Sequence, residues 1–370
     1  SLFTGAVQHE NFGRMEEIFP VATMSAAPAP FQFPEGGRID LPREFAFNGA
    51  TRNLQEFLAL TDTMALLVLK DGAVRYESYA LGGTRTTKWV SMSVAKSFVS
   101  AALGIAVGEG AIRSIEEPVT AYLPELAGSA YDGVRIKDIL QMSSGAGWNE
   151  DYSDPDSDIN RFISIFAHGG SFNDFAATLS RARQPGSFNL YNSTDTQVLG
   201  MLLARATGRP IRDYLEEKLW HPLGMETAGC WLIDSTGMEM AFGGLNATAR
   251  DYGKIGELFR NHGLWQGRRI VPADWVRASV TPDGPHLQPG DTGLSDSALG
   301  YGYQWWVMDG TEGEYSAIGV YNQFVYVNPA RGVTIVKLSA SRDYGTTNDE
   351  TSYREFETID MLRAIAASVE

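Results

Sequence analysis

The segment SMSVAKSFVSAALGIAVGEG, residues 91–110, is the feature that most constrains the fold of this chain. Alanine, valine, phenylalanine, leucine and isoleucine occupy nearly every face of a helix drawn through it, so we expect a helix that is buried on most sides. Ser91 and Ser93 are the expected caps at its start, and Gly108 or Gly110 is the expected stop. The chain has 370 residues, which is too long for one small core and indicates one large domain or two that share an interface.

Extended segments stand near both ends of the chain. MALLVLK and AVRYESYA flank Asp71-Gly72, a pattern that is typical of a β-hairpin. YSAIGV, QFVYVNP and VTIVKLSA indicate consecutive antiparallel strands, with a turn over residues 329–332 between the last two. We expect the strands from both ends to pair in one antiparallel sheet. An amphipathic helix over residues 349–369 is expected to pack on this sheet through a stripe of Phe356, Ile359, Leu362, Ile365 and Ala366.

The middle of the chain, residues 111–230, has mainly helical patterns separated by acidic and glycine-rich loops. The predicted fold is therefore α/β, of the α+β type: an antiparallel sheet flanked by helices, plus a mostly helical lobe. We expect an irregular N-terminal arm over residues 1–50, a sheet domain formed by residues 51–110 and 231–370, and a helical domain over residues 111–230. A cleft is expected between the two lobes, where small-molecule sites are common.

The charge of the chain narrows the classes of partner. The net charge is −15 and no run of basic residues is visible, which argues against a nucleic-acid partner. One explanation of the negative charge is that it keeps the protein soluble. The alternative is that it belongs to a site that prefers neutral or cationic substrates. No stretch of eighteen or more apolar residues occurs, so we predict no membrane span. The first residues lack a basic region followed by an apolar core, which favours a cytoplasmic location and leaves a cleaved export signal open.

Cysteine and histidine residues give no sign of a metal site. The only cysteine is Cys230, so an intrachain disulfide and a cysteine-based metal cluster are excluded, and we expect a buried apolar filler. No two of the five histidines lie within ten residues of each other, so the spacing of paired histidine ligands is missing. The sequence therefore predicts no metal site and no cofactor.

Ser93 and Lys96 form a candidate catalytic pair. At helical spacing both side chains lie on one face, within reach of each other. Backbone N–H groups and the dipole at a helix N-terminus favour the negative charge of an alkoxide or an oxyanion. A lysine in apolar surroundings loses solvation, so its pKa falls toward neutrality and its amine can accept the serine proton. The alternative is a lysine that extends to the surface beside a capping serine.

Two further positions fit acyl-transfer chemistry. Tyr191 stands just before a helical pattern, where its hydroxyl can donate a proton to a leaving group. The alternative is a core tyrosine with a satisfied hydroxyl. Gly319 lies on a predicted strand, where a glycine lets a substrate approach the backbone, and the N–H that follows it can serve as half of an oxyanion hole. The alternative is an ordinary strand glycine at a bulge.

Several stretches resemble those of the serine β-lactamase-like hydrolases and occur in the same order. This group includes class C β-lactamases, D-alanyl-D-alanine peptidases, family VIII carboxylesterases and 6-aminohexanoate-dimer hydrolases. The stretches are SVAK at 93–96, LPELAG at 123–128, DILQMSSGAGW at 138–148, YNS at 191–193, GGLNATARDYGKIG at 243–256, GYGYQWW at 300–306 and the strand around Gly319. The resemblance extends from about residue 55 to about residue 365, and it implies a β-lactamase/transpeptidase-like fold.

The resemblance implies roles for individual residues. Ser93 resembles the nucleophile of the family, and Lys96 resembles the base that activates it. Tyr191 resembles the tyrosine of the Tyr-x-Asn motif of the family. The backbone N–H groups of Ser93 and Val320 resemble the two donors of its oxyanion hole.

The chain departs from the family pattern in two motifs. Ser193 stands where the Tyr-x-Asn motif has asparagine. Ala317 and Ile318 stand where the penicillin-recognising members carry lysine and threonine, which bind the substrate carboxylate and amide. Because charge-assisted hydrogen bonds are the strong ones, losing that cation should weaken the binding of an anionic β-lactam.

Among these groups, the 6-aminohexanoate-dimer hydrolases resemble the chain most. WNEDYSDPDSD at 148–158 resembles their substrate loop, with Tyr152 at their substrate-contacting tyrosine. SAIGVYNQ at 316–323 resembles their third motif, and Trp306 resembles their aromatic wall. The implied substrate-binding residues are Tyr152, Trp306, Ile318 and Gly319. The loop acids are expected to attract an ammonium group on a linear amide, or alternatively to form a solvated cluster of caps and turns: Glu150, Asp151, Asp154, Asp156 and Asp158.

These observations favour a serine hydrolase that cleaves small esters or linear amides through an acyl-enzyme intermediate. The alternative interpretation is that the chain is a β-lactamase or a D-Ala-D-Ala peptidase that acts on β-lactams or cell-wall fragments. A non-enzymatic binding protein of this fold is less favoured, because it would be expected to lose Ser93, Lys96 or Tyr191. We expect the binding partner to be a small-molecule ester or amide substrate. We expect no binding to nucleic acid or to a membrane. A homodimer is the alternative to a monomer.

Overall fold

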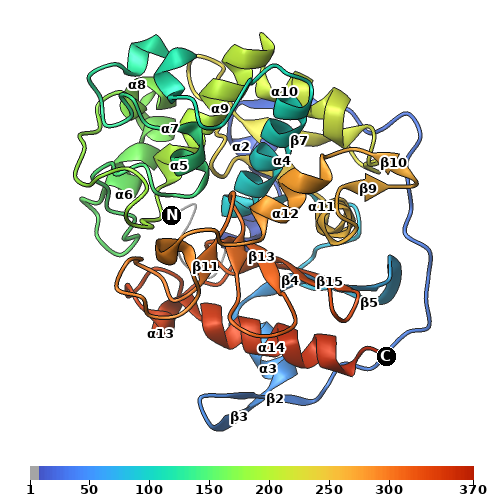
Figure 1. Cartoon of the computed structure of the whole chain (residues 1–370). Coiled ribbons are helices and arrows are strands. Elements are labelled where there is room, and N and C mark those ends of the chain that lie inside the picture. The colour runs from blue at the N-terminus through green and yellow to red at the C-terminus, as the bar shows by residue number, and fades with distance from the viewer. Residues whose placement is uncertain (1–7) are drawn as a thin grey trace.

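The computed structural model describes residues 8–370, and its centre is an antiparallel sheet (Figure 1). The strands of this sheet are, in chain order, β4 (Thr63–Lys70), β5 (Ala73–Tyr79), β11 (Gly300–Tyr301), β12 (Trp306–Val307), β13 (Tyr315–Gly319), β14 (Gln323–Asn328) and β15 (Val333–Ser339). Their order across the sheet is β11-β12-β13-β14-β15-β4-β5. Because β15 pairs with β4, strands from both ends of the chain form one sheet, and this prediction is confirmed.

The predicted turns in this sheet are present. Asp71 and Gly72 have φ angles of 48° and 78°, the left-handed geometry that suits the twist of a two-residue hairpin. Before β15, the N–H of Gly332 donates to the carbonyl oxygen of Pro329 at 3.2 Å. Short connections therefore keep β13, β14 and β15 adjacent, as the sequence predicted.

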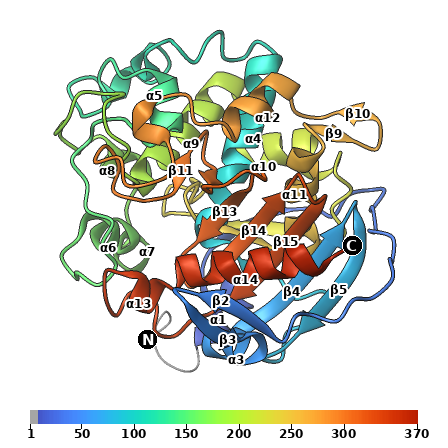
Figure 2. The same cartoon turned by 60° about the horizontal axis from the view of Figure 1, so that its bottom comes forward.

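Helices cover both faces of the sheet. Leu66 and Val68 of β4 belong to the apolar cluster that contains α14 (Glu355–Ser368), which crosses the sheet in Figure 2. Leu67 and Leu69 point the other way, into the cluster that contains α11 (Ala249–Arg260). A strand that is buried on both faces has no polar side, which explains the unbroken apolar run of β4.

The C-terminal helix differs from the prediction in two respects. It is divided into α13 (Glu350–Tyr353) and α14 by Arg354, whose φ of 48° lies in the left-handed region. Ile359, Leu362, Ile365 and Ala366 are buried as predicted, but Phe356 is 38% exposed, so its assignment to the apolar stripe is wrong. Phe356 is the second residue after Arg354, in the first turn of α14, and its ring lines a cavity instead of the sheet.

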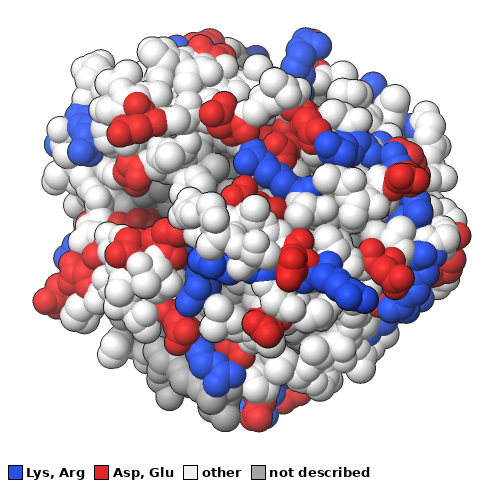
Figure 3. Space-filling view, turned by 90° about the horizontal axis from the view of Figure 1, so that it is seen from below, with Lys and Arg blue, Asp and Glu red and all other residues white. Residues whose placement is uncertain are grey.

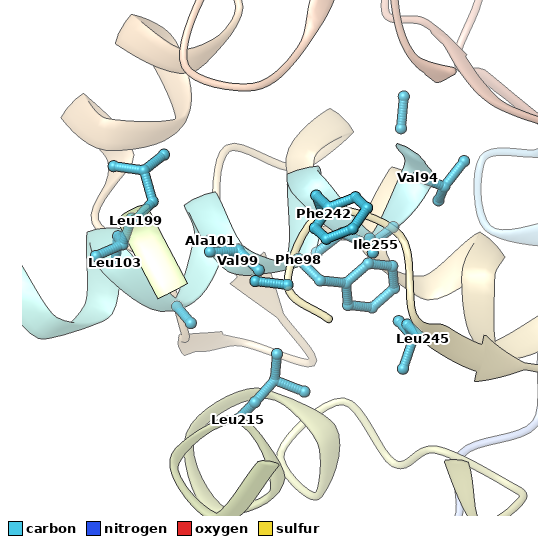
Figure 4. Close-up of a cluster of buried hydrophobic side chains, with 14 of the residues drawn as sticks. Val94, Phe98, Val99, Ala101, Leu103, Leu199, Leu215, Phe242, Leu245 and Ile255 are labelled. Carbon is cyan, nitrogen blue, oxygen red and sulfur yellow. The ribbon is translucent and has the colours of Figure 1, made fainter. Parts of the chain in front are cut away.

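The expected buried helix is α4 (Ala95–Gly108), preceded by a 3-10 turn over Met92–Val94. Its residues from Ala95 to Ala106 are all buried. Figure 4 shows side chains of this helix, including Phe98 and Leu103, among Leu199 and Leu215 from other helices. The predicted end is confirmed, since Gly108 is the last helical residue.

The predicted caps of this helix are wrong. The side chain of neither Ser91 nor Ser93 accepts a hydrogen bond from a helix N–H. The Oγ of Ser91 donates instead to the carbonyl oxygens of Met92 and Gly243, at 2.9 and 3.3 Å. The tight 3-10 turn leaves the side chain of Ser93 free to contact Lys96.

Most of the remaining helices lie in the middle of the chain, and four further strands form a second, smaller sheet. The helices are α5 (Ile136–Leu140), α6 (Asp158–Ile163), α7 (Ile165–His168), α8 (Phe172–Ala176), α9 (Ser193–Thr207), α10 (Ile211–Leu215) with a π-helical extension over Glu216–Trp220, and α12 (Ala273–Ser279). The second sheet has the order β1-β7-β8-β6, from β1 (Val21–Met24), β6 (Trp89–Val90), β7 (Gly229–Leu232) and β8 (Leu245–Ala247). Cys230 of β7 is buried, as predicted.

Residues 1–7 of the expected N-terminal arm lie outside the described residues. Residues 8–50 are more regular than predicted. They contain α1 (Gln8–Phe12), α2 (Met15–Ile18), β1 and β2 (Glu44–Phe47), and β2 pairs with β3 (Ala50–Asn53). β1 pairs with β7, far along the chain, so the sequence near residue 21 alone could not reveal its partner.

The other elements are α3 (Leu54–Leu60), the pair β9 (Leu264–Trp265) and β10 (Arg268–Arg269), and 3-10 turns at Val119–Ala121, Pro124–Leu126 and Pro285–Leu287. None of the helices within residues 8–370 combines the length and apolar composition that a bilayer crossing requires.

Candidate active site

The turn that carries Ser93 packs directly against β13. A Cβ atom at Gly319 would lie 2.8 Å from the carbonyl oxygen of Ser91 and 3.0 Å from the nitrogen of Ser93, so only glycine permits this contact. Met92, just before Ser93, has a φ of 45°, a left-handed conformation that costs a non-glycine residue roughly 1–3 kcal/mol. The sequence analysis expected a substrate to approach the backbone closely at Gly319. In the structure, the backbone of Ser91 and Ser93 makes this close approach. It brings the backbone of Ser93 beside the strand that ends before Val320.

Lys96 is buried behind Ser93. Its Nζ donates to the Oγ of Ser93 at 2.7 Å, to the carbonyl oxygen of Phe242 at 2.8 Å and to the Oγ of Ser193 at 3.2 Å. Burial lowers the pKa of Lys96 to about 7, although the Glu150 carboxylate acts in the opposite direction. The side chain is only 2% exposed, so the alternative of a lysine that reaches the surface is wrong.

Tyr191 lies beside Ser93 and Lys96, in the loop before α9. Its ring stacks on that of Trp306, with centroids 5.1 Å apart, and the Nζ of Lys96 lies 5.0 Å from its centroid. Burial holds the pKa of Tyr191 well above its ordinary value, against the opposing effect of a hydrogen bond with Ser93. The phenol therefore stays protonated near neutral pH and is available as a proton donor.

Glu150 is a site residue that sequence reasoning did not single out. Its carboxylate accepts hydrogen bonds from the Oγ and N–H of Ser193, at 2.5 and 3.0 Å, and from the hydroxyl of Tyr152 at 3.2 Å. The indole of Trp148 donates to it as well. Burial raises the pKa of Glu150, and the charge of Lys96 opposes that rise. Ser193, which replaces the asparagine of the family motif, thus connects the carboxylate to Lys96.

The acidic loop around Glu150 divides into two parts. Glu150 and Asp151 line a cavity beside Ser93. Asp154 and Asp158 instead hold the loop together, accepting from the side-chain amide and the backbone N–H of Asn149 at 3.0 and 2.8 Å. Two of the loop acids thus line a cavity and others form the turn, and the attraction of an ammonium group by the loop stays a prediction.

Two cavities meet at Ser93, which lines both together with Tyr152 and Val320. The first, called here the apolar cavity, has a volume of about 390 Å³ and side chains of Phe19, Ile163, Phe166, Leu232, Met240 and Phe242 in its wall. The second, called the acidic cavity, has a volume of about 460 Å³ and contains Glu150, Asp151, Asp296, Asp349, Glu350 and Glu355. In Figure 3 acidic side chains border a hollow on the left, the side on which α13 lies in Figures 1 and 2.

The structure brings the predicted site residues together. Tyr191, Trp306, Ile318 and Gly319 line the acidic cavity, and Tyr152 lines both cavities. Lys96 is absent from both linings because it contacts Ser93 from behind the cavity wall. The arrangement places a serine hydroxyl on both cavities, a buried amine behind it and a protonated phenol on the acidic cavity. These are the groups that acyl transfer requires.

Several known proteins resemble this chain in sequence or in fold. The chain is 31% identical over 350 residues to the 6-aminohexanoate-dimer hydrolase of Paenarthrobacter ureafaciens, which covers 90% of this chain and 86% of that protein. The structure of a candidate 6-aminohexanoate-dimer hydrolase from Bacillus anthracis superposes with a TM-score of 0.88 at 22% identity, over 99% of this chain and 95% of that one. EstCE1, a hydrolase with promiscuous acyltransferase activity, superposes with a TM-score of 0.66 at 16% identity, over 85% and 96% of the two chains.

The two superpositions show a shared fold, and the sequence relative shows the family. The predicted α+β fold of the β-lactamase/transpeptidase type is thereby confirmed. The β-lactamase family model matches residues 50–358, a range that includes Ser93, Lys96, Glu150, Tyr191 and Val320. The chain therefore belongs to the β-lactamase family.

Proposed function

We propose that the protein is a serine hydrolase that cleaves small esters and linear amides through an acyl-enzyme intermediate. One observation carries the proposal: a buried lysine with its pKa lowered to about 7 donates a 2.7 Å hydrogen bond to the Oγ of a serine that lines two cavities. A neutral amine at that position is a base for the serine proton. The named activity of the Paenarthrobacter relative, on the dimer of 6-aminohexanoate, supports linear amides as one substrate class.

The geometry suggests the order of steps. Lys96 accepts the proton of Ser93 as the Oγ attacks the substrate carbonyl carbon. The N–H groups of Ser93 and Val320 stabilise the oxyanion. Tyr191 donates its proton to the leaving oxygen or nitrogen as the bond to the carbonyl carbon breaks. A water molecule then attacks the acyl-enzyme, with the proton transfers reversed, and releases the acid.

The second candidate, hydrolysis of β-lactams or cell-wall peptides, lacks a cation in the expected position. Ala317 and Ile318 occupy the positions of the lysine and threonine in the penicillin-recognising members. Among residues 8–370, no lysine or arginine lines either cavity. An anionic β-lactam would therefore meet acidic groups without a charge-assisted partner, a bond worth roughly 1.5–3 kcal/mol.

A substrate panel tests the proposal. We expect hydrolysis of p-nitrophenyl butyrate and of the linear 6-aminohexanoate dimer, and slow turnover of the cephalosporin nitrocefin. A fluorophosphonate probe should label Ser93, as read from the mass of its peptide. Fast nitrocefin hydrolysis would support the second candidate, and a probe that leaves Ser93 unlabelled would support a binding protein.

The pH dependence of the reaction should follow Lys96. Because the neutral amine is the active form, kcat/KM for a neutral ester is expected to rise with pH, with a midpoint at about 7. Below that pH the ammonium form cannot accept the serine proton. A rate profile from pH 5 to 9 measures the midpoint, and a profile that is flat across this range would contradict the assignment of the base.

Replacing Glu150 by glutamine is expected to move that midpoint to lower pH. The carboxylate is the charge that raises the pKa of Lys96 against burial, so its removal lets the pKa fall further. Glutamine keeps the shape of the side chain and an acceptor for Ser193. Asp151→Asn makes the same charge change one residue away and is the matched control, with a smaller shift expected. An unchanged midpoint in Glu150→Gln would show that Glu150 does not position or tune the base.

A further inference from the structure

The two cavities at Ser93 are not equivalent with respect to Tyr191. Tyr191 lines the acidic cavity and is absent from the lining of the apolar cavity. In the proposed function, the leaving group receives its proton from Tyr191, so its oxygen or nitrogen must face that side. The acyl part of the substrate then extends from Ser93 into the apolar cavity. The direction in which a substrate binds therefore follows from the position of one hydroxyl.

The apolar cavity suits an uncharged acyl chain. Among residues 8–370, no Asp, Glu, Lys, Arg or His lines it. Phe166, Phe242 and Met240 form part of its wall, and Asn160 and Ser164 are among its few polar side chains. A charged acyl chain would lose hydration there without gaining an ionic partner, which is costly.

The acidic cavity has the opposite character. It contains six carboxylates, and no lysine or arginine of the described residues lines it. Glu150 accepts a hydrogen bond from Ser193, Asp151 accepts from the N–H of Ser153 at 2.8 Å, and Asp349 accepts from the N–H of Thr351 at 2.9 Å. The other three are Asp296, which accepts from the N–H of Tyr191 at 3.5 Å, Glu350 and Glu355.

The carboxylate of Glu355 is the least satisfied of these three. Within residues 8–370 it has no hydrogen-bond or ion-pair partner, whereas Glu350 accepts from the N–H groups of Glu355 and Glu357 at 3.0 and 2.9 Å. Burial, then the charges of Glu350 and Asp296, raise the pKa of Glu355 to about 8. Burial likewise raises the pKa of Asp296 to about 6. A cation between these groups would reduce the repulsion among the acidic side chains and would be attracted by their negative charge.

Aromatic rings complete the same cavity. Trp306, Tyr344, Tyr353 and Phe356 line it, and the rings of Tyr344 and Tyr353 are stacked with centroids 4.8 Å apart. Aromatic faces attract ammonium groups, above all quaternary ones, through their quadrupoles. Carboxylates and aromatic rings together, with no competing cation in the described lining, form a pattern that recognises an organic ammonium ion and not an anion.

We propose that the acidic cavity is the leaving-group subsite and that it selects a cation. The preferred substrates are then esters of amino alcohols, or amides of diamines, that carry an uncharged acyl chain. This inference rests on the proposed function and narrows it. A leaving group that ends in a carboxylate, as 6-aminohexanoate does, meets repulsion in this cavity, so the linear dimer should react more slowly than an analogue in which that carboxylate is replaced by an amine.

A pair of esters with one acyl group tests the inference. Butyrylcholine and 3,3-dimethylbutyl butyrate have nearly the same shape, but only the first carries a positive charge on its leaving group. We expect kcat/KM for butyrylcholine to be about tenfold higher at low ionic strength, and the preference to shrink as salt is added. The butyrate ester of 4-hydroxybutyrate, whose leaving group carries a carboxylate, should be slower than the neutral ester.

Substitutions of Asp296 and Glu355 test whether these side chains cause the preference for the cationic ester. Measured above pH 8, where Glu355 is ionised, the ratio of kcat/KM for the cationic ester to that for the neutral ester should fall toward one in Glu355→Gln and in Asp296→Asn/Glu355→Gln. Because both substrates are measured on the same variant, the ratio cancels any loss of folded or active enzyme. Asp274→Asn is the matched control, since its side chain is 87% exposed and outside both cavities, and it should keep the wild-type ratio.

The outcomes separate this inference from the function on which it rests. Hydrolysis of both esters by the wild-type enzyme at equal kcat/KM would overturn the cation subsite and leave the hydrolase intact. A wild-type preference that survives in the double variant would overturn the role of these carboxylates. Failure of the wild-type enzyme to hydrolyse either ester or p-nitrophenyl butyrate would overturn the proposed function and the inference together.

Discussion

Replacing Ser93 by alanine is expected to lower kcat for p-nitrophenyl butyrate by a factor on the order of 10⁴–10⁶. The substitution removes the only atom that can form the acyl bond in the proposed mechanism, so no remaining step can compensate. The fold should be retained: the hydrogen bonds lost from the Oγ of Ser93 are those with Lys96 and Tyr191, and Lys96 keeps Phe242 and Ser193 as partners.

The matched control for this substitution is Ser97→Ala. Ser97 lies on α4, four residues after Ser93, and its Oγ donates to the carbonyl oxygen of Gln304 at 2.7 Å. Losing that bond is expected to cost about 1 kcal/mol of stability and little activity. Ester hydrolysis at the wild-type rate in purified Ser93→Ala would remove Ser93 from the mechanism, whatever the control shows.

Replacing Lys96 by methionine is expected to lower kcat by roughly 10²–10⁴-fold, the usual contribution of a general base. Methionine has a similar length and fits a buried, apolar position without the cost of burying an amine. The free energy of unfolding should therefore fall little or rise, while the rise of kcat/KM around pH 7 disappears. Urea denaturation and the pH profile of the same preparation measure the two effects.

Lys337 provides the matched control for this second substitution. It is also a buried lysine, and burial lowers its pKa well below the ordinary value. Its Nζ donates to the hydroxyls of Thr61 and Ser339, at 3.0 and 2.6 Å, and to Asn322, and it lines neither cavity. Lys337→Met is expected to keep the midpoint near pH 7. Loss of the midpoint in this variant, with Lys96→Met unaffected, would contradict the assignment of the base.

Local sequence patterns predicted the parts of this protein that depend on backbone geometry. The Asp71-Gly72 turn was recognisable because the left-handed φ angles of a short hairpin favour those residues. The burial of α4 followed from apolar side chains on nearly every face. Ser93 and Lys96 were within reach of each other because positions three apart share a face of a helix, and the ordered motifs identified the family.

Errors arose where a residue depends on partners that are distant in the sequence. Ser91 was expected to cap a helix, but its hydroxyl donates to Gly243. Phe356 was expected on the sheet, but the left-handed Arg354 restarts the helix with that ring facing a cavity. Glu150 looked like one acid among five in a loop, and only its contacts with Ser193 and Tyr152 distinguish it.

The sequence by itself determined that this chain has the strands, the buried helix and the catalytic residue types of a β-lactamase-family hydrolase. Such features are local, since they depend on residue spacing and on the intrinsic geometry of turns and helices. Only the tertiary structure decided what surrounds Ser93: an apolar cavity on one side, and on the other an acidic cavity built from Glu150, Asp296, Glu350 and Glu355. Segments so far apart in the chain converge only through packing, so no local pattern can reveal the charge of the cavity that they form.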